Sequence, residues 1–389
     1  MKKVLGIVLE LNPFHLGHEY FIKEAKKIVN PDVTISVISS NFTMRGDPMV
    51  IDKFSKTKML IDNDLCDLVL ELPFISGVNS SDYFTSNSIN ILKSFKITDL
   101  CFGAETDDIN ILYKIIDLLE SSNYQTELKN YLDKGFSFST SSFKAIQNIT
   151  DDLEIIKNYP LPNNTLAIGY LRALRGTSIV PHIIKRIDND FYDDTINNSG
   201  FCSASALRKA ITENKTINDF VPEYVRNYNI LNPKMLNDNL FYLLRYRLLK
   251  DDFKDVSLVY EGIENRLQSF INSKDYDEFT RNVQTKRYPE NKIKRLILHI
   301  LLDISSKLDY QYIYYLRILG MNSIGKKHVS TLPKETKEKI ITSFKNKNDE
   351  IVKIELTSTK LYGIISNNYD LYKEEYNIPY RKDWFNWIH

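Results

Sequence analysis

The sequence predicts an α/β fold, a doubly wound parallel sheet followed by a mainly α-helical C-terminal region. Three observations predict it. Short apolar runs alternate with helical spacing of apolar residues up to about residue 105, helical patterns dominate from about residue 215, and 389 residues are many for one hydrophobic core. We therefore expect two domains, residues 1–215 and 216–389, with a helical insertion at about 107–160 in the first.

The first domain alternates strands with helices. Its strand candidates are short runs rich in Val, Ile and Leu, such as "VLGIVLE" and "VTISVIS", which suit buried parallel strands. The expected strands are residues 4–10, 33–39, 67–73, 99–105 and 177–186. The expected helices are residues 53–64, 82–95, 107–121, 125–147, 164–175 and 203–211, together with one that begins between His15 and His18.

The second domain has a nearly all-helical pattern. Apolar residues recur at helical spacing in "NDNLFYLLRYRLL" and in "NKIKRLILHILLDI". Prolines and polar residues in "NDFVPEYVRNYNILNPKM" place the boundary between the domains at about 215–235.

Composition excludes several classes of protein. The net charge is +1, so any RNA-binding surface has to come from local clustering of basic residues. Cys66, Cys101 and Cys202 form no CxxC pair, which argues against a zinc site or a disulfide framework and fits a reducing cytoplasm. Glu10 interrupts the N-terminal apolar run, so we reject a signal peptide, and no stretch approaches the roughly 18 apolar residues of a membrane span. We expect a cytoplasmic protein with no membrane segment and no obligate protein partner.

The sequence "FHLGH" places two histidines where the first strand passes into a helix. His18 falls in the first turn of this helix and His15 just before it, and Gly17 leaves room for a ligand to approach the backbone. Free backbone N–H groups and the helix dipole favour anions at this end, and a histidine can donate to a transferring phosphoryl group. The alternative is a pair of helix-capping and core histidines. We favour a nucleotide-handling enzyme.

Other candidate residues follow strands at the same edge of the sheet, where ligands bind in doubly wound folds. In "NFTMRGDP", Arg45 can meet a phosphate or a carboxylate such as acetate, with Asp47, Asp52 and Lys53 nearby; the alternative is an exposed turn of solvated charges. In "FGAE", Gly103 permits close approach of a purine or ribose, although an ordinary strand-to-helix turn would read the same way.

The opening motif and the stretches after it resemble a known family. "FHLGH" resembles the H-x-G-H element of nucleotidyltransferases and class I aminoacyl-tRNA synthetases. No KMSKS-like element is evident in the sequence, which argues against a true class I synthetase. "GIVLELNPFHLGHEYFIKEAKK" is similar to the start of the tRNA(Met) cytidine acetate ligase family. "NFTMRGDP", "DLVLELP", "FGAE", "LPNNTLAIGYLRAL", "IIKRI", "SASALR", "YEGIENRL", "TKRY" and "IYYLRILGMN" extend the resemblance to about residue 322.

Four positions depart from the usual family pattern. Leu11 stands in place of Tyr, Leu16 in place of Asn, Ser40 in place of Gly and Ala104 in place of Ser. These changes put the contacts to base and sugar in doubt more than the class of reaction.

The resemblance implies a Rossmann-like adenylyltransferase fold joined to a helical tRNA-binding region. It implies an ATP-dependent ligase that forms acetyl-adenylate from acetate and acetylates the wobble cytidine of elongator tRNA(Met) to N4-acetylcytidine, releasing AMP and pyrophosphate. His15, His18 and Arg45 would be catalytic. ATP is the expected cofactor, with Mg²⁺ on its phosphates and no metal ligand assigned to the protein. Two alternatives stay open: a small-molecule nucleotidyltransferase, and a non-catalytic nucleotide-dependent RNA-binding protein.

The resemblance also implies a set of ATP-binding residues. Ser203, Ser205 and Arg208 of "SASALR" would clamp the β- and γ-phosphates at a second helix N-terminus, although Ser203 can instead be a plain cap. In "PNN" we assign Asn163 to the nucleotide and regard Asn164 as the helix cap. The full set is Ile7, Val8, Leu9, Glu10, Leu11, Asn12, Pro13, Phe14, His15, Leu16, Gly17, His18, Glu19, Tyr20, Gly103, Asn163, Arg186, Ile187, Ser203, Ser205 and Arg208.

A basic cluster in the second domain is the candidate tRNA-binding surface. Between residues 281 and 295, six basic side chains stand against the single acid Glu290, a net charge of +5 on a chain of net +1. The six are Arg281, Lys286, Arg287, Lys292, Lys294 and Arg295. The aromatic tail "YRKDWFNW" can stack on an unpaired base. The alternatives are a solvated charged face and a tail that docks on its own domain.

Overall fold

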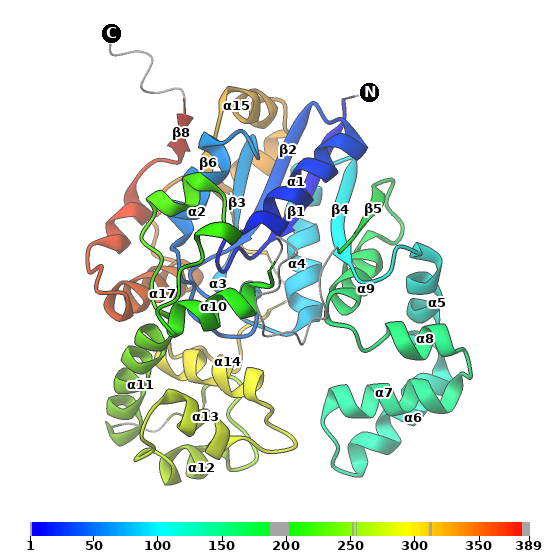
Figure 1. Cartoon of the computed structure of the whole chain (residues 1–389), viewed down its shortest axis with the longest axis vertical. Coiled ribbons are helices and arrows are strands. Elements are labelled where there is room, and N and C mark those ends of the chain that lie inside the picture. The colour runs from blue at the N-terminus through cyan, green and yellow to red at the C-terminus, as the bar shows by residue number, and fades with distance from the viewer. Residues whose placement is uncertain (1, 187–201, 251–252, 254, 311–312, 383–389) are drawn as a thin grey trace.

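The computed structural model describes residues 2–186, 202–250, 253, 255–310 and 313–382. A sheet-bearing body carries two helical lobes below it in the view of Figure 1. One lobe is the insertion, residues 109–158, and the other holds helices between residues 233 and 301. The first strand starts near the N-terminus at the top and runs toward the lobes, so the lobes lie at the edge where the parallel strands end.

The central sheet contains eight strands among the described residues. They are β1 (Val4–Leu9), β2 (Val33–Ser39), β3 (Leu68–Leu72), β4 (Asp99–Ala104), β5 (Val180–Lys185), β6 (Leu316–Met321), β7 (Ile340–Ile341) and β8 (Tyr380–Arg381). Their order is β5-β4-β1-β2-β3-β6-β7, with β8 paired to β6. Strands β1 to β5 are mutually parallel, whereas β6 is antiparallel to β3.

The winding direction of the sheet reverses between β1 and β4. The chain builds outward from β1 to β2 and β3, then returns to the other side of β1 for β4 and β5. A crevice outside the carboxyl ends of the strands at such a reversal is where doubly wound folds bind ligands. The predicted α/β fold is confirmed, and its reversal places the ends of β1 and β4 side by side.

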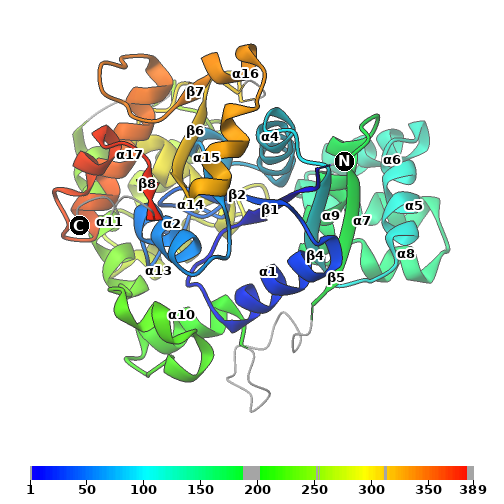
Figure 2. The same ribbon diagram turned by 90° about the horizontal axis from the view of Figure 1, so that it is seen from above.

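Helices cover both faces of this sheet. One face packs against α1 (Leu16–Val29), α2 (Lys53–Asp62) and α10 (Ala204–Thr212), and the other against α4 (Ser81–Ser94) and α9 (Pro162–Leu174). Figure 2 shows α1 and α4 on opposite sides of β1. Because both faces are covered, a strand can be buried along its whole length, as "VTISVIS" is.

The insertion differs in one respect from the expectation. It comprises α5 (Ile109–Leu119), α6 (Ser122–Asp133), α7 (Phe138–Ile149) and α8 (Leu153–Asn158). The single helix expected over 125–147 is wrong, since the chain turns between α6 and α7. Gly135 has φ +82°, which ends the helix, and the Ser137 hydroxyl caps the next one.

The C-terminal half is mainly α-helical, as expected, but it also contains three strands. Strands β6, β7 and β8 extend the sheet, and β6 is buried along its whole length. The helices are α11 (Pro233–Lys250), α12 (Ile263–Ser269), α13 (Tyr276–Val283), α14 (Glu290–Leu301), α15 (Ser323–Ser330), α16 (Lys334–Glu338) and α17 (Glu350–Ile365), with short helices α3 (Phe74–Gly77), η1 (Asn218–Phe220), η2 (Glu223–Asn227) and η3 (Leu371–Tyr376) elsewhere. The division into domains at 215 stays a prediction. Among the described helices, none combines the length and apolarity needed to cross a membrane.

Candidate functional site

Two histidines cap the N-terminus of α1 in the loop that follows β1. The Nδ1 atom of His15 accepts from the Gly17 N–H at 3.1 Å, and Nδ1 of His18 accepts from the His15 N–H at 3.3 Å. Their ring centroids lie 3.7 Å apart. Both rings are therefore helix caps, as the alternative interpretation held. Because Nδ1 accepts in each ring, Nε2 carries the ring hydrogen and is the atom able to donate to an anion.

His15 lies among positive charges. Burial, together with the guanidinium groups of Arg186 and Arg208, lowers the pKa of His15 to about 3. The ring is therefore neutral near pH 7 and can act as a hydrogen-bond donor without its own charge. Arg186 follows β5 and Arg208 lies on α10, so two distant segments bring positive charge to the same loop.

The second predicted phosphate element, at the start of α10, is joined to the loop of residues 10–15 between β1 and α1, here called the histidine loop. Nη1 of Arg208 donates to the Asn12 carbonyl at 2.7 Å, and Nη2 donates to the Ser205 hydroxyl at 3.2 Å. The Ser203 hydroxyl accepts from the Ala206 N–H at 3.1 Å, so Ser203 is the cap of α10. The Arg208 side chain thus joins the first turns of α10 to the loop that leads into α1, an arrangement that suits a polyphosphate.

A third group forms where β4 ends. The Glu105 carboxylate accepts from the Asn163 N–H at 3.0 Å, from the Asn163 amide Nδ2 at 2.7 Å and from the Asn164 N–H at 2.7 Å. The Asn163 Oδ1 atom accepts from Nη1 of Arg186 at 3.0 Å. Gly103 lies in the same place, since a Cβ there would sit 3.7 Å from Cγ of Arg186. The fold therefore brings Gly103, Asn163 and Arg186 together as predicted.

The capping role expected of Asn164 is wrong. The N-cap of α9 is Leu161, which has no capping side chain, and Glu105 satisfies the free N–H groups from outside the helix. Asn164 is fully buried and instead accepts from the Glu105 and Thr106 N–H groups at 3.0 and 3.3 Å. Sequence reasoning missed Glu105, although an acid that ends a strand before a helix start is a usable signal.

The loop of residues 41–48, which carries Arg45, is fastened to β1. Oε1 of Glu10 accepts from the Met44 N–H at 2.6 Å, and Oδ1 of Asn12 accepts from the Val50 N–H at 2.8 Å. Burial raises the pKa of the Glu10 carboxyl. These two residues of the predicted ATP-binding set therefore hold the Arg45 loop against the histidine loop.

Lys56 is a further residue of this site that sequence reasoning missed. It is fully buried, and its Nζ donates to the carbonyls of Ser39 at 2.9 Å, Ser40 at 3.0 Å and Glu10 at 3.2 Å. Burial lowers its pKa to about 7. Lys56 thereby joins the carboxyl ends of β1 and β2 beneath the Arg45 loop.

Asp52 and Lys53 were expected near a ligand, but other groups occupy both side chains. Asp52 caps α2, accepting from the Phe54 and Ser55 N–H groups at 2.9 Å each. Lys53 is fully buried and forms ion pairs with Glu71, with Glu375 at 2.6 Å and with Glu355 at 3.4 Å. Burial opposes the charge, but these carboxylates raise the pKa of Lys53 well above its usual range. Lys53 joins α2 to the C-terminal segment.

The remaining predicted ATP-binding residues fall into two groups. Ile7, Leu9, Leu11 and Phe14 are buried in the core that packs α1 against the sheet, so any ligand contact there would come from the backbone. Pro13 lies in the loop before α1, Leu16, Glu19 and Tyr20 lie in the first turns of α1, and Val8 is a partly buried residue of β1. Ile187 lies outside the described residues. The ATP-binding role of the whole set stays a prediction.

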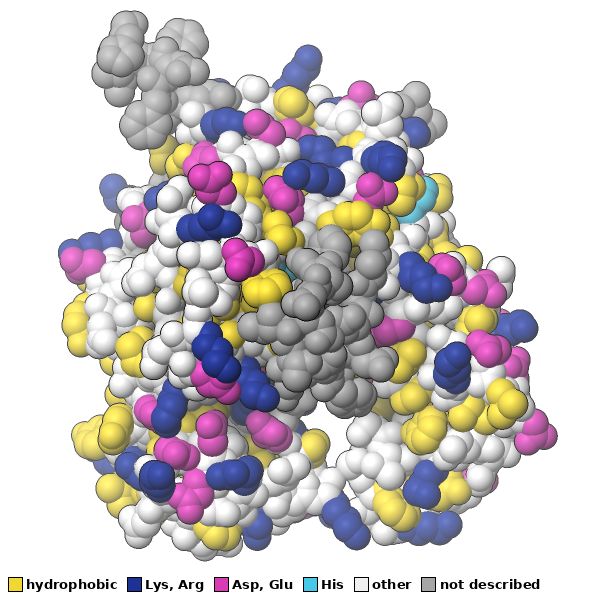
Figure 3. Space-filling view, viewed as in Figure 1, with side chains coloured by type: hydrophobic (Ala, Val, Ile, Leu, Met, Phe, Trp, Pro, Cys, Tyr) yellow, Lys and Arg dark blue, Asp and Glu magenta, His cyan; other side chains and the backbone are white. Residues whose placement is uncertain are grey.

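The basic cluster divides into outward-facing and inward-facing side chains. Arg281, Lys286 and Arg287 are exposed, and Arg287 pairs with Glu261 at 2.5 Å. Lys286, Arg287 and Gly135 of the insertion line a cavity of about 390 Å³, and the space-filling view shows an opening between the two lobes (Figure 3).

The other three members contact protein groups. The Nζ atom of Lys292 lies 4.4 and 4.0 Å from the ring centres of Tyr260 and Tyr288. Lys294 and Arg295 are turned toward the Arg45 loop. The tRNA-binding role of the cluster stays a prediction, and the aromatic residues of the tail lie outside the described residues.

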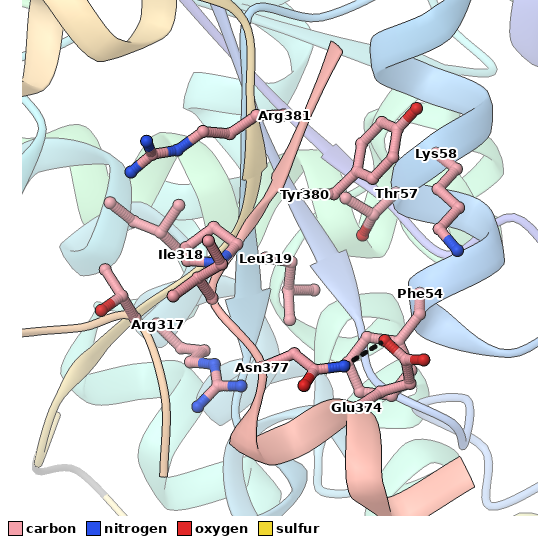
Figure 4. Close-up of a pocket in the computed structure, with 13 residues that line it drawn as sticks. Phe54, Thr57, Lys58, Arg317, Ile318, Leu319, Glu374, Asn377, Tyr380 and Arg381 are labelled. Atoms are coloured by element: carbon pink, nitrogen blue, oxygen red, sulfur yellow. Dashed lines mark hydrogen bonds between the residues drawn. The ribbon is translucent and has the colours of Figure 1, made fainter. Parts of the chain in front are cut away.

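A second cavity, of about 370 Å³, lies between α2, β6, β8 and η3 (Figure 4). Its lining includes Lys58, Arg317, Tyr380 and Arg381, and none of the predicted site residues lines it. This cavity is separate from the three groups at the strand ends.

The described side chains do not fit a protein-held metal ion. Across the described ranges, no three His, Cys, Asp or Glu side chains gather as metal ligands. Asp47, the carboxylate next to the Arg45 turn, is paired with Lys294, and the Glu10 carboxyl binds a backbone N–H. We derive no chemical step through a metal ion.

Comparison with known proteins identifies the relatives of this chain. Residues 1–377 match the family model described as HIGH Nucleotidyl Transferase. The tRNA(Met) cytidine acetate ligase of Caldicellulosiruptor saccharolyticus is 34% identical over 95% of this chain and 96% of its own length. That of Staphylococcus haemolyticus is 31% identical over 94% of this chain and 95% of its own.

Solved structures give the same result. The apo structure of Thermotoga maritima TmcAL superposes with a TM-score of 0.88 at 27% identity, covering 97% of this chain and 99% of that one. A second structure of that protein, bound with alpha-thio ATP, gives a TM-score of 0.82 at 26% identity with the same coverage. By family model, sequence and fold, this chain belongs to the HIGH nucleotidyltransferases and, within them, to the tRNA(Met) cytidine acetate ligases.

Proposed function

We propose that this enzyme activates acetate with ATP to acetyl-adenylate and transfers the acetyl group to the wobble cytidine of elongator tRNA(Met). One observation carries the first step. The Arg208 side chain joins α10 to the loop before α1 by donating to the Asn12 carbonyl at 2.7 Å, and the charges of Arg186 and Arg208 both act on His15. Such a site suits the triphosphate of ATP. A structural relative is described as bound with alpha-thio ATP.

In the first step an acetate oxygen attacks the α-phosphorus of ATP. The bond between the α-phosphorus and its bridging oxygen breaks, pyrophosphate leaves, and acetyl-adenylate remains. Nε2 of His15 and of His18 donates hydrogen bonds to the charge that builds on the transferring group. Arg208 and Ser205 hold the departing pyrophosphate, and Arg45 orients the acetate carboxylate. The arrangement supports this assignment because Glu10 and Lys56 fix the Arg45 loop against the histidine loop.

The proposed binding site for the adenosine part of ATP is the group of residues at the end of β4. Asn163 and Arg186 are held in a fixed geometry by Glu105, and Gly103 leaves the adjacent strand end without a side chain. An amide and a guanidinium so fixed can recognise the polar edge and the face of a purine.

In the second step the exocyclic amine of the cytidine attacks the acetyl carbonyl, loses a proton, and AMP departs. That amine is conjugated with its ring and is a poor nucleophile, so an activated acyl donor is chemically necessary. The acceptor is proposed from the relatives, which are named tRNA(Met) cytidine acetate ligases. Arg281, Lys286, Arg287 and Lys292 are the proposed phosphate contacts, and Lys286 and Arg287 among them line the cavity that Gly135 of the insertion also lines.

Mg²⁺ carried on the phosphates of ATP stays part of the proposal as a counter-ion, with no protein ligand assigned. A cytoplasmic location also stays part of it, since Cys66, Cys101 and Cys202 are all buried and form no disulfide.

Acetate-dependent exchange of pyrophosphate into ATP tests the first step without tRNA. The wild-type enzyme should exchange label only when acetate is present, and His18→Ala should abolish exchange while the protein still melts in one cooperative transition, lowered by the loss of one capping hydrogen bond. Exchange that requires another acceptor in place of acetate would indicate a small-molecule nucleotidyltransferase. No exchange with any acceptor would indicate a nucleotide-dependent RNA-binding protein.

A further inference from the structure

Helix α14 approaches the Arg45 loop more closely than a side chain on that loop would permit. Gly46 has φ +93°, and a Cβ built there would lie 2.7 Å from the backbone N of Arg295 and 2.7 Å from the backbone C of Lys294. Nη1 of Arg295 reaches the Met44 carbonyl at 3.5 Å. Backbone therefore packs on backbone, and the position of α14 sets the position of the loop.

Lys294 holds this contact with an ion pair. Its Nζ lies 2.9 Å from Oδ1 of Asp47 in the loop and 2.8 Å from Oε1 of Glu290 on its own helix. The Lys294 side chain is 16% exposed and that of Asp47 is 19% exposed. Burial opposes the Asp47 charge, but Lys294 and the nearby arginines lower the pKa of Asp47 overall. The Lys294 ammonium is therefore largely buried and already paired with two carboxylates, whereas a lysine that contacts a nucleic-acid phosphate is usually exposed in the free protein.

The turn around Asp47 transmits that hold to Arg45. The Asp47 N–H donates to the Thr43 hydroxyl at 3.0 Å, the Thr43 N–H donates to the Asp47 carbonyl at 2.9 Å, and the Gly46 N–H donates to the Thr43 carbonyl at 2.9 Å. Arg45 lies inside this closed turn. On its other side, the Met44 N–H is held by Glu10.

We propose that Lys294 is a positioning residue for adenylate formation, which fixes Asp47 and with it the Arg45 loop, and that it is not a contact for tRNA. This inference rests on the proposed function, because it concerns the loop expected to orient acetate. It removes Lys294 from the predicted tRNA-binding cluster and gives it a role that needs no tRNA.

The test is Lys294→Met, which keeps the length of the side chain and removes its charge. A displacement of about 1 Å in a positioning group can cost about 100-fold in rate, so we expect the kcat of acetate-dependent exchange to fall about 10- to 100-fold. Binding of tRNA(Met), and its dependence on salt, should stay at wild-type values. Lys360→Met, an exposed lysine on α17, is the matched control and should leave both readouts unchanged.

A double-mutant cycle identifies the partner. Asp47→Asn breaks the same pair from the loop side and should lower exchange to a similar extent, and the double variant should be little worse than either single one. Lys294→Arg, which keeps the charge, should retain much more exchange than Lys294→Met.

Three outcomes would overturn the inference. Full exchange in both Lys294→Met and Asp47→Asn would remove the positioning role. A weaker tRNA affinity in Lys294→Met, with the log–log salt slope reduced by about 0.7 to 0.9, would restore Lys294 as a phosphate contact. No exchange in the wild-type enzyme would refute the proposed function itself, and this inference with it.

Discussion

Glu105 offers the sharpest test of how the nucleotide site is held. Its carboxylate receives three N–H groups: the Asn163 N–H at 3.0 Å, the Asn163 Nδ2 at 2.7 Å and the Asn164 N–H at 2.7 Å. Replacing Glu105 with Gln keeps the shape but turns one oxygen into an NH₂ group. If the remaining oxygen keeps both Asn163 donors, the NH₂ group faces the Asn164 N–H, donor against donor.

The size of the effect follows from that geometry. One charge-assisted hydrogen bond to the start of α9 is lost, and such bonds contribute about 1.5–3 kcal/mol. The negative charge beside the helix N-terminus is lost as well, for about 0.3–1 kcal/mol. We expect the free energy of unfolding to fall by about 2 kcal/mol. Because the lost bond anchors the start of α9, which carries Asn163 and through it orients Arg186, ATP affinity should fall about tenfold.

Urea unfolding and calorimetric titration with ATP measure the two effects. Glu350→Gln is the matched control, because Glu350 is an exposed acid in the first turn of α17 and should tolerate the change. Wild-type ATP affinity in Glu105→Gln would refute the reasoning, since it would separate Asn163 and Arg186 from the nucleotide. Unchanged stability with weaker ATP binding would instead make Glu105 a direct ligand contact.

Three further variants probe the rest of the site. Arg208→Ala removes the bond to the Asn12 carbonyl and a charged phosphate contact, so calorimetry should show ATP affinity lower by about 10- to 100-fold; an unchanged affinity would exclude it from the site. Gly46→Ala places a Cβ 2.7 Å from backbone atoms of α14, at a residue with φ +93°. The free energy of unfolding should fall by more than about 1 kcal/mol, and exchange activity should fall as well. Wild-type values in both assays would mean that the loop does not pack as described. Burial lowers the pKa of His15 to about 3, so the unfolded chain takes up a proton below about pH 6.5 that the folded one does not. As the pH is lowered below 6.5, the free energy of unfolding of the wild type should therefore decrease relative to that of His15→Asn, by about 1.4 kcal/mol per pH unit. Urea unfolding at pH 7.5 and at pH 5 measures this difference. A difference that is the same at both pH values would contradict the reasoning.

Elements whose signal is local could be predicted from the sequence. The run "VTISVIS" is β2, residues 33–39 as expected, because its many β-branched residues favour a strand and all seven positions are buried. The break at Gly135 also had a local signal, a glycine followed by a capping serine, which the prediction of one long helix overlooked. By contrast, "LRILGM" forms β6 because it pairs with β3, which is about 250 residues away in the chain. No pattern within the segment itself predicts this pairing.

The candidate site divides in the same way. His15, His18 and Ser203 could be placed from the sequence because a helix start follows a strand or a loop at each. Lys56 and Lys294 could not, because a lysine on an amphipathic helix looks exposed until the tertiary fold supplies its carbonyls or its carboxylate.

Strand β6 also sets an order of events during synthesis of the chain. It pairs with β3, and Asn322 just after it bonds the Asp67 carboxylate at 2.7 Å across 255 residues. Until that segment leaves the ribosome, the edge of β3 has unpaired backbone groups, and Lys53 lacks both Glu355 and Glu375. Pairing over so long a separation is slow, so the nascent N-terminal half needs protection from aggregation while it waits. A fragment that stops at residue 215 should therefore be poorly soluble, and the catalytic sheet is completed only when almost the whole chain has been made.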